Sequence, residues 1–203
     1  MQVTIVGGTG LVGQGIIQEL VKIPGYKVYS LSRHGKRYDS QLGATYYAGS
    51  FDDERWQELI KSSDWVIDCV GILRENLSKG QTYQNTIIEP ANRIAELMKS
   101  GENKLLFVSA NYAPKSLARY LTAKKLAEQL LKTKLSHRVT ILYPGLIYDR
   151  QRQSTYYLGR ALALVKKWPG FAKIRPIARN DFAKEVVAII SRNKKSSLQI
   201  RRV

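Results

Sequence analysis

The sequence is poor in the residues that build metal sites and disulfide frameworks. It contains one cysteine, Cys69, and two histidines, His34 and His137, among 203 residues. A single cysteine excludes a disulfide within the chain, and histidines this far apart do not give the short spacing of a metal-ligand motif. We therefore expect no metal site and no zinc-dependent chemistry.

Long hydrophobic runs and linker-like segments are missing as well. No uninterrupted apolar run approaches the roughly 18 residues that a membrane-spanning helix needs. The first predicted strand begins near Gln2, which leaves no room for a leader peptide, so a cytoplasmic protein is expected. No repeat, low-complexity tract or Pro/Gly/Ser linker divides the chain, and its length suits one large domain. We predict a single domain over residues 1–203.

Acidic residues are scarce relative to basic ones. The chain has 33 Lys and Arg against 16 Asp and Glu, a formal net charge of +17 at pH 7. Such a balance favours anionic partners, which include nucleic acid, anionic lipid headgroups and phosphorylated ligands. The basic residues are spread along the chain without a zinc-finger, RNP or KH pattern, so the sequence disfavours nucleic acid. A generally solvated basic surface is the simpler interpretation.

Strand patterns alternate with helical patterns along most of the chain. The predicted strands lie at 3–6, 27–31, 44–47, 65–70, 104–108 and 138–142, and the predicted helices at 11–21, 54–60, 91–99 and 117–132. This alternation indicates an α/β fold, a Rossmann-fold doubly wound parallel sheet with helices on both faces. Residues 147–176 break the pattern and are expected to form a short C-terminal substrate-side segment. A last helix near 181–191 and a terminal strand near 198–201 follow.

A glycine-rich turn follows the first strand directly. Gly7, Gly10 and Gly13 form a GxxGxxG pattern at the start of an apolar-faced helix. The tight turn, the approach of a pyrophosphate to backbone N–H groups and the packing of helix on strand each call for a residue without a Cβ. The pattern predicts that this turn binds the pyrophosphate of a nicotinamide dinucleotide. Gly15, further along the helix, suggests no role.

The end of the second strand carries hydroxyl and basic groups. A Rossmann site that prefers NAD places an acid there, roughly twenty residues after the glycines. This chain instead has Ser32 and Arg33, with Lys36 and Arg37 close behind, and these groups suit a ribose 2′-phosphate. We predict NADP as the cofactor, with NAD as the alternative. Asp52, just past the third strand, is expected beside the adenine.

Tyr120 and Lys124 are four residues apart on a predicted helix, so both side chains project from one face. A neighbouring ammonium lowers the pKa of a phenol toward the working range, so we expect Tyr120 to act as an acid or base. Ser109 follows the strand at 104–108, at the sheet edge where ligands of open α/β sheets bind, and is expected to hold a substrate oxygen. A Tyr–Lys pair at this spacing also occurs on ordinary helix surfaces.

Several segments together resemble a known family. The chain contains VGGTGLVG, VIDCVGI, FVSAN, YLTAKKLAE and ILYPGLIYD in the order seen in extended and atypical short-chain dehydrogenases/reductases (SDRs), and the resemblance covers nearly the whole chain. Within that family the segments GILREN, PGLIYDRQR and IRPIARNDFAKEV resemble the atypical subgroup that holds the SDR-type accessory subunit of respiratory complex I and an SDR of fungal ubiquinone biosynthesis.

The resemblance implies a set of site residues. The cofactor would be lined by Gly7, Thr9, Gly10, Leu11, Val12, Arg33, Asp52, Val70, Gly71 and Lys124, with Pro144, Gly145 and Leu146 beside the nicotinamide. Ser109, Tyr120 and Lys124 match the catalytic positions. Asn85 is the candidate for a fourth catalytic residue, an asparagine, although Pro90 disturbs the helix that would carry it.

Two functions fit these residues. The first is an NADP-dependent oxidoreductase that acts on a carbonyl or alcohol of a small or prenylated quinone-like substrate. The second is a non-catalytic NAD(P)-binding module that stabilises a partner enzyme or membrane complex. Residues 155–168 are expected to form a helix whose apolar face either closes the core or rims the substrate pocket. In the latter case Arg160, Lys166, Lys167, Lys173 and Arg175 would rest on anionic headgroups of a membrane surface.

Overall fold

A parallel six-stranded sheet forms the centre of the protein. The computed structural model describes residues 1–34, 43–150, 157 and 174–202. The strands are β1 (Gln2–Val6), β2 (Lys27–Ser32), β3 (Thr45–Ala48), β4 (Trp65–Asp68), β5 (Lys104–Val108) and β6 (Val139–Leu142). Their order is β3-β2-β1-β4-β5-β6, and each neighbouring pair is parallel. This is the strand order of a doubly wound Rossmann sheet, so the predicted fold class is confirmed.

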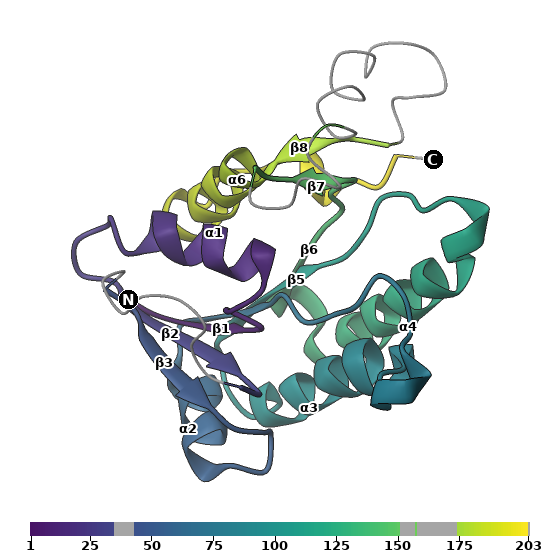
Figure 1. The fold of residues 1–203 in the computed structure, drawn as a ribbon. Coiled ribbons are helices and arrows are strands. Elements are labelled where there is room, and N and C mark those ends of the chain that lie inside the picture. The colour runs from purple at the N-terminus through teal and green to yellow at the C-terminus, as the bar shows by residue number, and fades with distance from the viewer. Residues whose placement is uncertain (35–42, 151–156, 158–173, 203) are drawn as a thin grey trace.

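Helices cover both faces of the sheet (Figure 1). One layer contains α1 (Leu11–Leu20) and α6 (Arg179–Arg192), and the other contains α2 (Glu54–Ser62), α3 (Glu89–Met98) and α4 (Ala118–Leu135). Successive residues of a strand face opposite sides, so Ile5 of β1 packs in the α1–α6 layer whereas Val6 packs in the other. Each face of the sheet therefore has its own apolar core.

Helix α3 begins with a distortion at the predicted place. A π-helical turn, Gln84–Ile88, runs directly into α3, and Pro90 lies in the first turn of that helix. Proline is tolerated there because the first N–H groups of a helix have no partner inside it. The disturbance expected from Pro90 thus shapes the start of the helix and leaves its body intact.

The predictions for the C-terminal third were partly wrong. The expected terminal strand at 198–201 is replaced by a 3-10 turn, Ser197–Gln199, because Ser196 and Gln199 form a capping box across it. Two short strands that were not expected, β7 (Ile147–Tyr148) and β8 (Ile177–Ala178), pair in a separate small sheet. The helix expected at 155–168 lies outside the described residues apart from Tyr157, whose side chain is exposed.

Two glycines allow close crossings in this region. A Cβ on Gly145 would lie 1.4 Å from the carbonyl oxygen of Ile174, because the chain at 174–175 crosses directly over it. The Gly145 N–H also donates to the carbonyl of Arg175 at 3.2 Å. A Cβ on Gly15 would lie 2.7 Å from Cγ of Arg179. Gly15, which has no evident role in the sequence, therefore lets α6 pack on α1.

The crossing at Gly145 gives the first prediction. Gly145→Ala is expected to lower the free energy of unfolding by about 2 kcal/mol or more, because the added methyl meets backbone that must shift. Urea unfolding measures the loss. Gly10→Ala is the control, since within the described part of the chain, its own neighbours in sequence apart, an added Cβ would come within 4 Å of one atom, the Gly7 oxygen at 3.3 Å. Its cost as a poorer helix cap should stay near or below about 1 kcal/mol. Equal stabilities for both variants would contradict the crossing.

Candidate dinucleotide and catalytic site

The glycine turn joins β1 to α1 at the carboxyl edge of the sheet. Gly7 has a φ of +82°, in the left-handed region that favours glycine. A Cβ on Gly7 would lie 3.1 Å from the backbone nitrogen of Val70. The Gly7 N–H donates to the carbonyl of Leu31 at 2.8 Å. The turn is thus held against the ends of both strands that neighbour β1.

Gly13 and Gly10 have different reasons to be glycine. A Cβ on Gly13 would lie 2.6 Å from the Gly7 oxygen, which is the close packing of helix on turn that the sequence predicts. Gly10 is exposed and has a φ of −75°, and neither packing nor conformation requires a glycine there. The open space beside Gly10 lies at the N-terminus of α1, where unpaired N–H groups favour an anion. The turn therefore fits a pyrophosphate.

The remaining residues predicted to line the cofactor lie at the same edge of the sheet. Thr9, Leu11 and Val12 belong to the turn and the first turn of α1, Ser32 ends β2, Val70 and Gly71 follow β4, and Pro144, Gly145 and Leu146 follow β6. All of these strands are parallel, so their carboxyl ends meet at one edge. The structure thus brings the predicted set to the crevice where doubly wound sheets bind ligands.

The groups predicted to contact the adenosine end of the cofactor have different partners. Arg33 follows β2 directly, is exposed, and makes no hydrogen bond or ion pair within the described part of the chain. Lys36 and Arg37 lie outside the described residues. The carboxylate of Asp52 pairs with Arg93 of α3, whose guanidinium also donates to the carbonyl of Phe51 at 3.2 Å. Arg33 is therefore available to a ligand.

Lys124 is a buried cation at the centre of the site. Its Nζ donates to the carbonyl of Val108 at 2.8 Å and to that of Val70 at 3.3 Å, so it ties the end of β4 to the end of β5. It also lies 4.6 Å from the centre of the Phe107 ring. Burial lowers the pKa of Lys124, and nearby Asp68, Cys69 and Glu128 counteract this effect.

Tyr120 lies one turn before Lys124 on α4. Its ring packs against that of Tyr83, with 6.1 Å between the ring centres. Burial raises the pKa of Tyr120 to about 12, and Tyr83 adds to the rise. The expectation that Lys124 lowers this pKa is wrong for this structure, because burial dominates and the ammonium is bound to two backbone carbonyls. At neutral pH the Tyr120 side chain is a neutral hydroxyl.

The other two predicted catalytic side chains are engaged elsewhere. The Ser109 hydroxyl is buried and donates to Glu128, which also pairs with Arg201. The exposed Asn85 accepts from the N–H of Thr82 at 2.9 Å and donates to the carbonyl of Gly80 at 2.7 Å. The structure therefore places Tyr120 and Lys124 on one helix face as predicted, but gives Ser109 and Asn85 partners within the protein.

Three charged residues of this region were missed by the sequence analysis. Glu128 stands four residues after Lys124, and the spacing that relates Tyr120 to Lys124 could have identified it. Asp68 ends the apolar strand β4 and is buried, so a lone acid in an apolar run was the available signal. Arg201 has no local signal, because its contacts with Glu128 and the Ala110 carbonyl depend on the tertiary fold.

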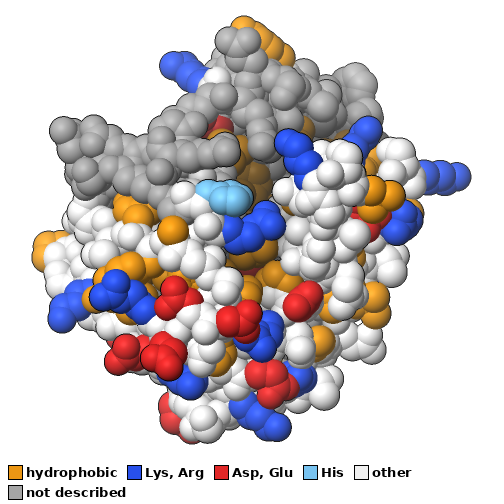
Figure 2. Space-filling view, turned by 60° about the horizontal axis from the view of Figure 1, so that its bottom comes forward, with side chains coloured by type: hydrophobic (Ala, Val, Ile, Leu, Met, Phe, Trp, Pro, Cys, Tyr) orange, Lys and Arg blue, Asp and Glu red, His pale blue; other side chains and the backbone are white. Residues whose placement is uncertain are grey.

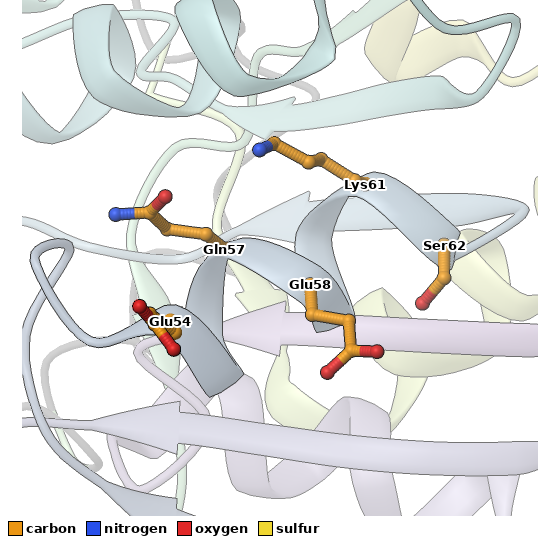
Figure 3. A pocket seen from close by; sticks show the side chains of 5 residues that line it. All are labelled: Glu54, Gln57, Glu58, Lys61 and Ser62. Carbon is orange, nitrogen blue, oxygen red and sulfur yellow. The ribbon is translucent and has the colours of Figure 1, made fainter.

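A separate cavity of about 450 Å³ lies on α2 and is lined by Glu54, Gln57, Glu58, Lys61 and Ser62 (Figure 3). Two carboxylates at its rim would repel a pyrophosphate, and none of its residues belongs to the predicted site. This cavity is therefore not the dinucleotide site.

The surface is not uniformly basic despite the net charge of +17. Acidic side chains gather in the lower half of the face shown in Figure 2. The start of α2 and the residues before it contribute four exposed acids, Asp52, Asp53, Glu54 and Glu58. Among the described residues, no group of three His, Cys, Asp or Glu side chains could hold a metal ion, and no helix is long and apolar enough to cross a membrane.

Comparison with known proteins agrees with this geometry. The chain resembles MoeE5, solved with UDP-glucuronic acid and NAD, at a TM-score of 0.70 and 14% identity over 97% of this chain and 74% of that one. It resembles the Bacillus cereus UDP-glucuronic acid 4-epimerase, solved with UDP-glucuronic acid and NAD, at a TM-score of 0.69 and 15% identity over 98% and 75% of the two chains. The Lactococcus lactis oxidoreductase ylbE gives a TM-score of 0.62 at 20% identity over 74% and 71%.

These identities are low, so the likeness concerns the fold. A sequence search of curated proteins gave no match. A family model described as NAD(P)H-binding matches residues 7–193, which include the glycine turn, Tyr120 and Lys124. The predicted resemblance to nicotinamide-binding SDR proteins is thus confirmed at the level of family and fold, and the narrower likeness to the complex I and fungal subgroup stays a prediction. The chain belongs to the NAD(P)H-binding family.

Proposed function

We propose that this protein is an NADP-dependent oxidoreductase of the SDR type, acting on a carbonyl or an alcohol. The observation that carries the proposal is the position of Lys124. Its ammonium is buried at the carboxyl edge of the sheet and bound to the Val70 carbonyl, in the turn that lies against Gly7. Tyr120 projects from the same face of α4, so an acid and a cation stand together beside the dinucleotide turn.

The chemistry divides between cofactor and protein. A bound nicotinamide supplies or accepts the hydride at the substrate carbon. In reduction, Tyr120 gives its hydroxyl proton to the carbonyl oxygen while the carbon takes the hydride; alcohol oxidation is the reverse. With a pKa near 12, Tyr120 holds this proton at neutral pH, which is the form that reduction needs. Lys124, bound to the Val70 and Val108 carbonyls, holds the turn beside the dinucleotide in place.

The preference for NADP rests on Arg33. The Gly7 N–H is bonded to the carbonyl of Leu31, which places the end of β2 beside the glycine turn. Arg33 follows two residues later, exposed and unpaired among the described residues. A guanidinium pairs well with a phosphate, whereas NAD sites use an acid to hold the ribose hydroxyls. MoeE5 and the Bacillus cereus epimerase were solved with NAD, so the proposed preference for NADP rests on this chain's own residues.

A second function is supported by a specific observation. Ser109 donates a hydrogen bond to Glu128, and Asn85 is bonded to the backbone of Thr82 and Gly80, so two of the four predicted catalytic side chains have structural partners. These contacts favour a non-catalytic NAD(P)-binding module that stabilises a partner enzyme or membrane complex. The Tyr120 substitution below separates this function from the first.

The substrate side is proposed on the sequence alone. Residues 155–168, outside the described part of the chain except for Tyr157, combine apolar side chains with Arg160, Lys166 and Lys167. We propose a prenylated quinone-like substrate taken from an anionic membrane surface, since such a segment offers apolar and basic groups together.

Dinucleotide binding is tested at Gly10. Gly10→Val should abolish the affinity for both NADP and NAD, because its side chain would fill the space beside the first turn of α1. Isothermal titration calorimetry measures the affinity, and circular dichroism with urea unfolding checks that the fold is kept. A folded variant that binds either dinucleotide as tightly as wild type would place the site elsewhere.

The cofactor preference is tested at Arg33. Arg33→Asp should reverse the preference from NADP to NAD, through lost pairing with the 2′-phosphate and added repulsion against it. Calorimetric affinities for both cofactors give the ratio. Arg192→Asp, at an exposed position on α6, changes the net charge equally and should leave the ratio unchanged. Equal affinities for NADP and NAD in wild type would refute the preference.

Catalysis is tested at Tyr120. Tyr120→Phe should reduce kcat/KM, or the ability to complement a deletion strain, by about 100-fold to 10,000-fold, since it removes the proton donor. NADP affinity should stay close to wild type. Tyr29→Phe, on β2, is the matched control and should keep full activity. Unchanged activity or complementation in Tyr120→Phe would favour the non-catalytic module.

A further inference from the structure

Asp68 is a buried carboxylate that the proposed chemistry does not use. It is the last residue of β4 and is only 1% exposed. Its Oδ1 accepts a hydrogen bond from the N–H of Val70 at 2.8 Å. Its Oδ2 is buried and has no hydrogen-bond partner among the described residues. Because an unpaired buried carboxylate oxygen is unfavourable, the position calls for a physical reason.

Lys124 bonds to Val70 as well, through the carbonyl of that residue. Asp68 accepts from the Val70 N–H, and Lys124 donates to the Val70 carbonyl at 3.3 Å. The next residue, Gly71, is so close that a Cβ on it would lie 3.4 Å from the Lys124 Nζ. Both polar groups of the Val70 backbone are therefore fixed by one carboxylate and one ammonium, in the turn that lies against Gly7.

The hydrogen bond alone does not explain an acid at this position. An asparagine oxygen would accept from the Val70 N–H equally well, without the cost of burying a charge. Burial raises the pKa of Asp68 to about 6, while Lys124 and the Val70 hydrogen bond counteract the rise. Lys124 is thus the opposite charge that favours the ionised carboxylate of Asp68.

We propose that Asp68 is a positioning residue that acts through Lys124, as its buried counterion and as its partner in holding Val70 beside the dinucleotide. The role in catalysis rests on the proposed function, whereas the pairing of the two charges does not. Among the described residues, the other titratable groups that act on Lys124 are Cys69, just after β4, and Glu128 on α4, and Tyr120 lies one turn away on the same helix.

The pairing is tested by following the Lys124 side chain directly. NMR titration of protein labelled with 13C in its lysine side chains gives the Lys124 signal, which is assigned by its absence in Lys124→Met. In wild type this signal should show a step near pH 6, where Asp68 takes up a proton. In Asp68→Asn the step should vanish and the Lys124 pKa should fall by about one unit or more, because a nearby opposite charge is lost.

Asp181→Asn, at an exposed position on α6, is the control and should leave the Lys124 titration as in wild type. An unchanged Lys124 pKa in folded Asp68→Asn overturns the proposal, and so does a wild-type signal without the step near pH 6. If Asp68→Asn does not fold, the wild-type titration decides. None of these measurements needs turnover, so failure of the pairing is distinguishable from failure of the oxidoreductase proposal, which Tyr120→Phe decides.

Discussion

The bond between the Lys124 ammonium and two backbone carbonyls is the contact on which the site depends. It joins the ends of β4 and β5 through Val70 and Val108, and it sets the register of α4 against the sheet. One turn later on α4, Glu128 makes a second such contact with the sheet, by accepting a hydrogen bond from Ser109. Because Tyr120 is carried on the same helix face, its position relative to the glycine turn follows from where these two buried side chains are anchored. The helix is thus oriented by its charges as much as by its apolar face.

The fold could be predicted where local pattern and tertiary structure agree. The apolar runs of β1, β4 and β5, and the glycines that follow β1, dictate strand, turn and helix within a few residues of their observed bounds. The sheet of β7 and β8 has two-residue strands, which are too short to show any periodicity. The turn at Ser197–Gln199 replaced an expected strand because a side-chain cap at Ser196 outweighs a short apolar pattern.

The site could be predicted where spacing along one element was enough. Tyr120 and Lys124 share a helix face because they are four residues apart, and that inference needs no tertiary information. The pKa of Tyr120 depends on burial against Tyr83, from another segment, so the predicted pKa shift had the wrong direction. The hydrogen bond from Ser109 to Glu128 likewise joins two segments, the residue after β5 and helix α4. Spacing identifies candidates, but their protonation and partners come from packing.

Buried charges and surface charges are arranged differently in this protein. Two cations that are buried or half-buried pair with a carboxylate: Arg179 with Asp149 at 3.1 Å, and Arg201 with Glu128. A buried charge needs an opposite charge nearby, because the free-energy cost of removing it from water exceeds the stabilisation that distant surface charges provide. The surplus of basic residues therefore lies at the surface. Arg33 is one of these exposed residues, and it follows two positions after Leu31, whose carbonyl accepts from the Gly7 N–H. In the proposed function, an anionic ligand at the glycine turn would meet this guanidinium, and its specificity would depend on that side chain more than on the net charge.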